Sequence, residues 1–94
     1  MADIDIQHVP EGNRYEARDG DEVLGRILYE TRGEVVVLTH TEVEPAAEGK
    51  GVGSGLARTA LDAIRAEGRQ VDPQCPFVAA WIERHPDYAE LIAQ

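Results

Sequence analysis

The chain has very little of what secreted and membrane proteins depend on. Cys75 is the only cysteine among its 94 residues, so it cannot build an internal disulfide framework, and a lone cysteine suits a reducing cytosol. No apolar run approaches the roughly 20 residues that a membrane-spanning helix needs. Residues 1–5 lack the basic and apolar regions of a signal peptide. We therefore expect a cytoplasmic protein without a membrane partner.

Positive charge is scarce as well. The nine Lys and Arg residues face 18 Asp and Glu residues, which gives a net charge of −9, and Lys50 is the only lysine. Nucleic acid is bound through clustered Lys and Arg that neutralise its phosphates, so we expect no nucleic-acid partner. No spacing of His, Cys, Asp and Glu predicts a metal site.

What the chain does contain is enough apolar material for a packed core. Hydrophobic residues make up 43% of the sequence, which is typical of a folded globule and not of a disordered chain. The length allows one domain, and no linker or repeat divides it. We expect residues 1–94 to form a single domain.

The first half of the chain has the patterns of β-strands. Apolar and polar residues alternate over residues 4–8 and 14–18, and a third strand is expected over 22–30. The Asp-Gly pair at 19–20 is a strong hairpin signal. Residues 35–40 begin with four consecutive apolar side chains, which predicts a strand covered on both faces. These segments predict an antiparallel meander of four strands.

The second half changes to a helical period. An apolar stripe predicts a helix over residues 54–67, which Gly68 ends. A short fifth strand is expected at 70–74, and Pro76 is well placed in the first turn of a second helix, with further helical turns after Pro86. The sequence therefore predicts an α+β fold. We expect its fourth strand, first helix and fifth strand to form a βαβ crossover, right-handed if the two strands are parallel.

The loop that enters the first helix is the strongest signal of function. Four glycines lie among residues 49–55, which is entropically costly unless something uses the exposed backbone. Unpaired N–H groups and the dipole at a helix N-terminus attract anions, and Lys50 adds an ammonium group. The loop predicts a phosphate or pyrophosphate site. The alternative is a flexible loop that only closes the crossover.

Two common phosphate-binding motifs do not match this loop. A P-loop needs a glycine where Glu44 stands and a Ser or Thr where Gly51 follows the lysine. A dinucleotide fingerprint needs a third glycine where Ser54 or Leu56 stands. The antiparallel strands before the loop also argue against a dinucleotide-binding unit, which starts from a parallel βαβ arrangement.

Four segments in order along the chain resemble the GNAT acetyltransferases. Residues 48–53 resemble the pyrophosphate loop of that superfamily, whose pattern is Q/R-x-x-G-x-G/A, and they open a long helix after the fourth strand. The other three segments are residues 40–43, 73–82 and 85–88. Together they resemble a subfamily of small GNAT-like proteins. The resemblance implies a minimal GNAT fold, with the meander followed by a helix, a short fifth strand and C-terminal helices.

The resemblance also implies acetyl-CoA as acetyl donor, bound where the fourth and fifth strands diverge. The pantetheine arm would pair with the backbone around Glu42 and Val43, and the pyrophosphate would meet the N–H groups of the glycine-rich loop. No metal cofactor is implied. The residues expected to bind the cofactor are Val43, Glu48, Gly49, Lys50, Gly51, Val52, Gly53 and Ser54.

The sequence departs from the family pattern in two places. Glu48 stands where most GNAT proteins carry Gln or Arg, so backbone N–H groups and Lys50 are expected to do more of the binding. The chain stops at Gln94, before the two further strands that wall the acceptor site in larger relatives. We expect an open acceptor surface, or one completed by a second chain, so both a monomer and a homodimer remain open.

Three residues are the candidates for catalysis. His40 and Glu42 share a face of the fourth strand if it is regular, and either could take the proton of an attacking amine. Cys75 lies just before the second helix, whose dipole favours a thiolate, and it could form a transient acetyl-cysteine. The alternatives are an ordinary strand histidine for His40 and a small buried hydrophobe for Cys75.

The remaining conspicuous side chains are expected to be structural. His8 continues the alternation of the first strand, and His85 lies at a helix boundary before a proline. Trp81 with Phe77 at i+4 is most simply core, although the pair could flank the adenine or pantetheine. The functional prediction is an acetyltransferase whose acceptor is unidentified: an amine is favoured, either a small amine or one on a protein, and a thiol remains open. The alternative is a non-catalytic acyl-CoA-binding or interaction module.

Overall fold

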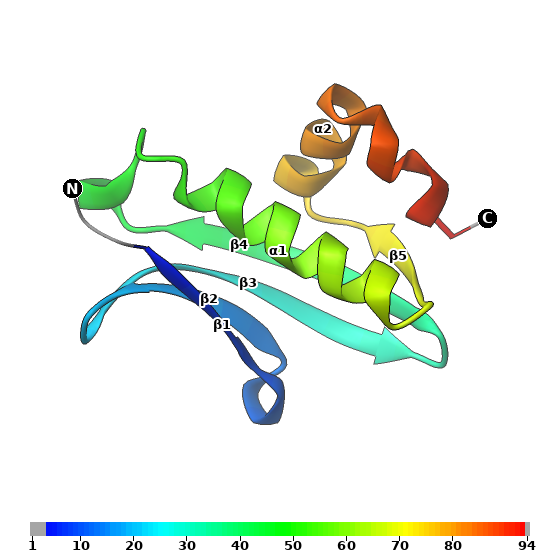
Figure 1. Ribbon diagram of the computed structural model, residues 1–94, viewed down its shortest axis with the longest axis horizontal. Coiled ribbons are helices and arrows are strands. Elements are labelled where there is room, and N and C mark those ends of the chain that lie inside the picture. Colours follow the sequence, from blue (N-terminus) through cyan, green and yellow to red (C-terminus); the bar gives the residue numbers. More distant parts are fainter. Residues whose placement is uncertain (1–3, 94) are drawn as a thin grey trace.

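A five-stranded mixed sheet forms the base of the computed structural model, which describes residues 4–93 (Figure 1). The strands lie in chain order across the sheet, the first four antiparallel and the last parallel to its neighbour. They are β1 (Asp5–Val9), β2 (Arg14–Asp19), β3 (Glu22–Arg32), β4 (Val35–Val43) and β5 (Gln70–Pro73). The predicted α+β fold and its four-strand meander are therefore confirmed.

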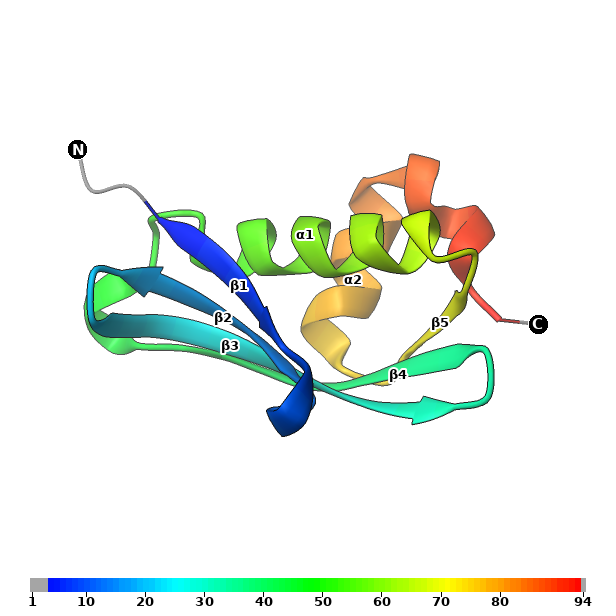
Figure 2. The ribbon, with the colours of Figure 1, turned by 60° about the horizontal axis from the view of Figure 1, so that its bottom comes forward.

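The helices lie on one face of this sheet (Figure 2). Helix α1 (Val52–Ala66) connects β4 to β5, and α2 (Pro76–Arg84) follows β5. Short 3₁₀ turns occupy Pro10–Gly12, Pro45–Ala47 and Pro86–Leu91. The first helix begins two residues earlier than the sequence predicts. Within residues 4–93, no helix combines the length and apolar character needed to cross a membrane.

The core lies between α1 and the sheet. The apolar stripe of α1, which includes Leu56, Ala60 and Ile64, is buried against inward-facing strand residues such as Ile27. Gly25 on β3 allows a close approach, because a Cβ atom there would lie 3.0 Å from Val52 Cγ1 and 2.8 Å from a backbone oxygen of β4. The missing side chain lets the first turn of α1 sit directly on the sheet.

A β-bulge at Thr39, halfway along β4, changes which side chains of this strand point toward the helices. Leu38 pairs with Tyr29 and His40 pairs with Leu28, so Thr39 is an extra residue in the ladder with β3. One extra residue reverses which later side chains point toward the helices. Thr41 therefore points toward the helices. His40 and Glu42 point to the opposite face of the sheet, which no described helix covers and which we call the bare face.

The two parallel strands pair only over a short stretch before they separate. β5 pairs with residues 35–38 of β4, and the Cys75 N–H then donates to the Leu38 carbonyl at 2.9 Å. Beyond this point the chain turns into α2, while β4 continues to Val43. The predicted divergence of the fourth and fifth strands is thus present, with α2 beginning beside it.

Candidate functional site

The glycine-rich loop turns the chain from β4 into α1. Gly49 and Gly51 have φ values of +81° and +79°, a region that favours glycine. Gly51 is the N-cap of α1, and no side chain caps the helix there. The first N–H groups of a helix have no partner within it. The loop therefore presents backbone donors at the positive end of the helix dipole.

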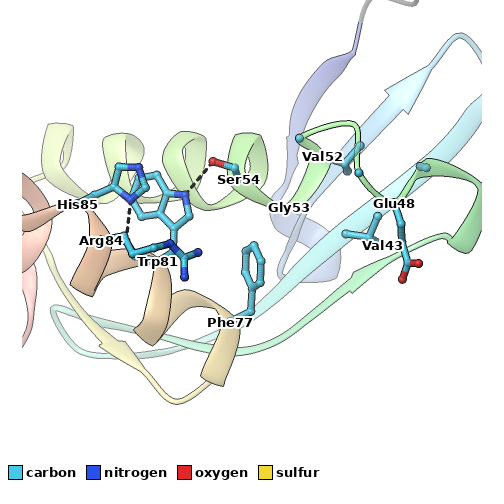
Figure 3. A pocket seen from close by; sticks show the side chains of 12 residues that line it. Val43, Glu48, Val52, Gly53, Ser54, Phe77, Trp81, Arg84 and His85 are labelled. Carbon is cyan, nitrogen blue, oxygen red and sulfur yellow. Dashed lines mark hydrogen bonds between the residues drawn. The ribbon is translucent and has the colours of Figure 1, made fainter.

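A pocket of about 510 Å³ opens beside this helix N-terminus (Figure 3). One wall is formed by the end of β4, the loop and the first turn of α1, and the other wall is formed by α2. The first wall contributes Val43, Ala47, Glu48, Gly49, Gly51, Val52, Gly53 and Ser54. The second contributes Phe77, Trp81, Arg84 and His85.

Two contacts hold the walls together. The indole Nε1–H of Trp81 donates to Ser54 Oγ at 2.8 Å, which ties α2 to the first turn of α1 (Figure 3). A Cβ atom on Gly53 would lie 2.8 Å from Phe77 Cζ, so the glycine gives the phenyl ring its place against α1. Phe77 is the one large apolar side chain that is exposed among the described residues, at 39%.

The far end of α2 is packed around its tryptophan. The His85 ring stacks on the Trp81 ring with centroids 3.8 Å apart, and His85 Nδ1–H donates to the Trp81 carbonyl at 2.7 Å. Arg58 of α1 lies over the same indole at 5.2 Å. His85 therefore packs at the helix boundary, as the sequence predicts, and the same side chain also lines the pocket.

A tyrosine fastens the last turns of the chain to α1. The Tyr88 hydroxyl donates to Asp62 Oδ1 at 2.7 Å, and this hydrogen bond, together with burial, raises the pKa of Tyr88. Arg65 of α1 donates to the Asp87 carbonyl at 2.6 Å. These contacts fix the C-terminal segment beyond the pocket.

The residues predicted to bind the cofactor come together in this pocket, with one exception. Lys50 is exposed in the loop but does not line the pocket. Glu48 does line it, and Figure 3 shows its carboxylate directed away from Ser54 and Trp81. The donors that this wall offers to the pocket are therefore backbone N–H groups and not a charged side chain.

The three predicted catalytic residues do not line the pocket. Cys75 is 4% exposed at the N-terminus of α2, and its Sγ lies 3.2 Å from Thr41 Oγ1. It sits at the point where β4 and β5 separate. Sequence reasoning did not include Thr41, because only the bulge at Thr39 turns that side chain toward Cys75.

His40 and Glu42 lie together on the opposite face of the sheet. The His40 Nε2 atom is 3.1 Å from Glu42 Oε1, and Glu42 also accepts a hydrogen bond from Arg26 at 3.0 Å. The sequence predicts that the two side chains lie on one face of the strand, and they do. The bulge, however, directs both side chains away from the helices and the pocket.

Arg84 is the charged pocket residue that the sequence did not predict. It lies three residues after Trp81 and seven after Phe77, which places all three on one face of a helix. That spacing is the signal that could have identified it. Among residues 4–93, no cluster of three or more His, Cys, Asp or Glu side chains is arranged to hold a metal ion.

Known structures share this architecture. A GCN5-like protein from Staphylococcus aureus, solved by NMR in solution, aligns with a TM-score of 0.76 and 21% identity over 99% of this chain and 91% of its own. An IAA acetyltransferase from Bacillus cereus ATCC 14579 aligns with a TM-score of 0.58 and 24% identity, over 77% of this chain and 52% of its own. The expected GNAT-type fold is confirmed.

Sequence comparison leads to the same family. Protein NATD1 of Gallus gallus is 29% identical over 85 residues, which cover 88% of this chain and 77% of that protein. The family profile described as GCN5-related N-acetyl-transferase matches residues 14–91. With most of its length matched, the chain belongs to the family of GCN5-related N-acetyl-transferases.

Proposed function

We propose that the chain is an acetyltransferase that binds acetyl-CoA between the glycine-rich loop and α2 and transfers the acetyl group to an amine. The observation that carries the proposal is the pocket at the N-terminus of α1, lined by the loop on one side and by α2 on the other. Membership of a family that uses acetyl-CoA supports the choice of donor. In this proposal residues 1–94 act as one domain.

The loop supplies what a pyrophosphate needs. Gly49 and Gly51 keep the backbone in a conformation that other residues rarely adopt, and neither carries a side chain between the N–H groups and a ligand. Unpaired donors at a helix N-terminus favour anions through both hydrogen bonds and the dipole. The chain has a net charge of −9 and repels an anionic donor at long range. Hydrogen bonds and the helix dipole at the loop offset this repulsion locally.

The separation of β4 from β5 supplies a place for the pantetheine arm. Across the gap, no backbone hydrogen bond joins residues 39–43 to α2 or β5 within the described chain. An extended amide chain could pair there with the edge of β4, as an added strand does. This path runs from Val43 in the pocket toward Cys75 and Thr41, where the thioester would lie.

Two routes of transfer fit this placement. In the direct route, the amine nitrogen attacks the thioester carbon, the C–S bond breaks, the CoA thiolate leaves, and a base takes the proton of the amine. In the other route, the Cys75 thiolate attacks the thioester carbon first, the C–S bond to CoA breaks, and the CoA thiolate leaves. The amine then attacks the acetyl-cysteine, its proton goes to a base, and the Cys75 thiolate is released. His40 and Glu42 serve the direct route only if the amine approaches from the bare face of the sheet.

A non-catalytic acyl-CoA-binding module is the second candidate. Two observations favour it: Cys75 is buried, and the His40–Glu42 pair lies outside the pocket. The two candidates share the binding site and differ in whether the thioester is consumed. They are separated by following free thiol release from acetyl-CoA.

The binding site is tested by comparing two glycines. Gly51 and Gly33 both have positive φ values, +79° and +61°, and neither has another atom within 4 Å of a Cβ position. Leucine at either position carries a similar backbone strain, roughly 1–2 kcal/mol, but only Gly51 lies in the pocket. By calorimetry, we expect Gly51→Leu to lose acetyl-CoA binding and Gly33→Leu to keep it. Equal affinities in the two variants would contradict the site.

The chemical route is tested by mass spectrometry after incubation with acetyl-CoA. The acetyl-cysteine route predicts an adduct of one acetyl group that is absent from Cys75→Ala. The direct route predicts no adduct and a Cys75→Ala variant that still releases CoA when an amine is supplied. If the wild type binds acetyl-CoA but releases no thiol above the buffer rate with any amine tested, the non-catalytic candidate stands.

A further inference from the structure

The pocket has a second charged end, opposite the glycine-rich loop. Arg84 and His85 line it at the C-terminal end of α2, and they are the only basic side chains among its lining residues. Figure 3 shows Arg84 extending from the same side of α2 as Trp81 and Phe77. The pyrophosphate proposal leaves this end unexplained.

Arg84 is unusual among the arginines of this acidic chain. Five others, at positions 14, 18, 26, 65 and 69, have a carboxylate within ion-pair distance, and Arg58 bonds to the Tyr88 hydroxyl. Within the described residues, no carboxylate pairs with Arg84. Arg32 also has no carboxylate partner in the described residues, so the absence of a partner does not by itself indicate a binding site. Arg84 differs from Arg32 because it also lines the pocket.

The neighbouring aromatic rings do not account for the position of Arg84 in the pocket wall. Trp81 is 1% exposed and already covered by the His85 ring on one side, so it has no face open to a nucleotide base. The C-terminal end of a helix also carries negative partial charge. An anion at this end of the pocket therefore needs a side-chain cation, and a guanidinium is the group best suited to a phosphate.

The spacing along α2 fits a ligand with two phosphate positions. Phe77 touches the first turn of α1 beside the loop, and Arg84 lies seven residues further along the helix. At 1.5 Å per residue this is about 10 Å. A ribose and an extended arginine side chain can bridge that length. CoA carries its pyrophosphate and its 3′-phosphate on opposite sides of one ribose.

We propose that Arg84 binds the ribose 3′-phosphate of CoA and so allows the protein to distinguish CoA from dephospho-CoA. The inference rests on the proposed CoA site and adds a specificity-determining residue to it. His85 contributes by position: its stack on Trp81 and its bond to the Trp81 carbonyl fix the end of α2 that carries Arg84.

The test compares the affinities of CoA and dephospho-CoA by calorimetry. We expect the wild type to prefer CoA by at least about tenfold, the size of one charge-assisted contact. Arg84→Gln should bring the ratio close to one by weakening CoA while leaving dephospho-CoA unchanged. Arg32→Gln is the matched control, because it removes another arginine without a carboxylate partner from outside the pocket, and it should keep the wild-type ratio.

The possible outcomes distinguish a failure of the 3′-phosphate site from a failure of the proposed CoA pocket. A wild type that binds both nucleotides equally, or an Arg84→Gln variant that keeps the preference, overturns the 3′-phosphate site and leaves the CoA pocket standing. A wild type that binds neither nucleotide overturns the CoA pocket itself. Adenosine 3′,5′-bisphosphate competing better than ADP in the wild type, but not in Arg84→Gln, is the expected second readout.

Discussion

At the scale of single residues, Glu16 is a buried carboxylate held by two arginines. It is 5% exposed on β2, accepts from Arg14 at 2.6 Å and from Arg18 at 2.7 Å, and these hydrogen bonds, Arg14 first, lower its pKa from the ordinary value of 4.5. A folded-state pKa below the unfolded value means that the stabilisation is complete above pH 4.5. It is lost as the pH falls through the lower folded value.

We therefore expect Glu16→Gln to lower the free energy of unfolding by about 1–2 kcal/mol at pH 7, and by much less under acidic conditions where the wild-type carboxyl is protonated. Urea denaturation at both pH values measures this difference. Glu30→Gln is the control, because Glu30 is exposed on β3 and no ion pair involves it in the described part of the chain. A loss for Glu16→Gln that stays the same at both pH values would show that charge is not the cause.

At the scale of elements, the pocket depends on how α2 is attached to α1. The bond between Trp81 and Ser54 is the polar part of that attachment, and the indole is buried. Removing the hydroxyl leaves the indole N–H without a partner, which costs about 1–3 kcal/mol. Both walls of the pocket would then lose their fixed spacing.

A double-mutant cycle with Ser54→Ala and Trp81→Phe measures this coupling by thermal or urea unfolding. We expect a coupling energy of about 0.5–3 kcal/mol, since the second change costs less once the first has broken the bond. Each single variant should also bind acetyl-CoA more weakly. Simple addition of the two destabilisations would mean that the helices are held by apolar packing alone.

The same elements show what sequence patterns could and could not predict. Alternation and turns predict the meander, and glycine spacing predicts the loop wall of the pocket, because both are properties of neighbouring residues. The bulge at Thr39 left no such pattern, so the facing of His40, Glu42 and Thr41 was not predictable. Arg84 was missed because a charged residue at the end of a helix is usually solvated.

At the scale of the whole molecule, the pocket joins segments that are distant in sequence. Its loop wall ends at Ser54 and its helix wall begins at Phe77, with most of α1 and all of β5 between them. The bare side of the sheet is lined by charged side chains such as Arg26 and Glu42, and it contributes nothing to the pocket. The unfolded chain cannot hold the two walls together, so a ligand that touches both binds only the folded state.

This linkage gives a prediction for the complete chain. Acetyl-CoA at about 100 times its dissociation constant should stabilise the fold by about 2.7 kcal/mol. For a chain of 94 residues, that corresponds to a rise in Tm of roughly 10–20 °C. Differential scanning calorimetry measures the shift, and Gly51→Leu, which keeps the core but loses the ligand, should show none. A ligand that binds by calorimetry yet leaves Tm unchanged would mean that the unfolded chain binds it as tightly as the folded one, which would contradict a site that only folding assembles.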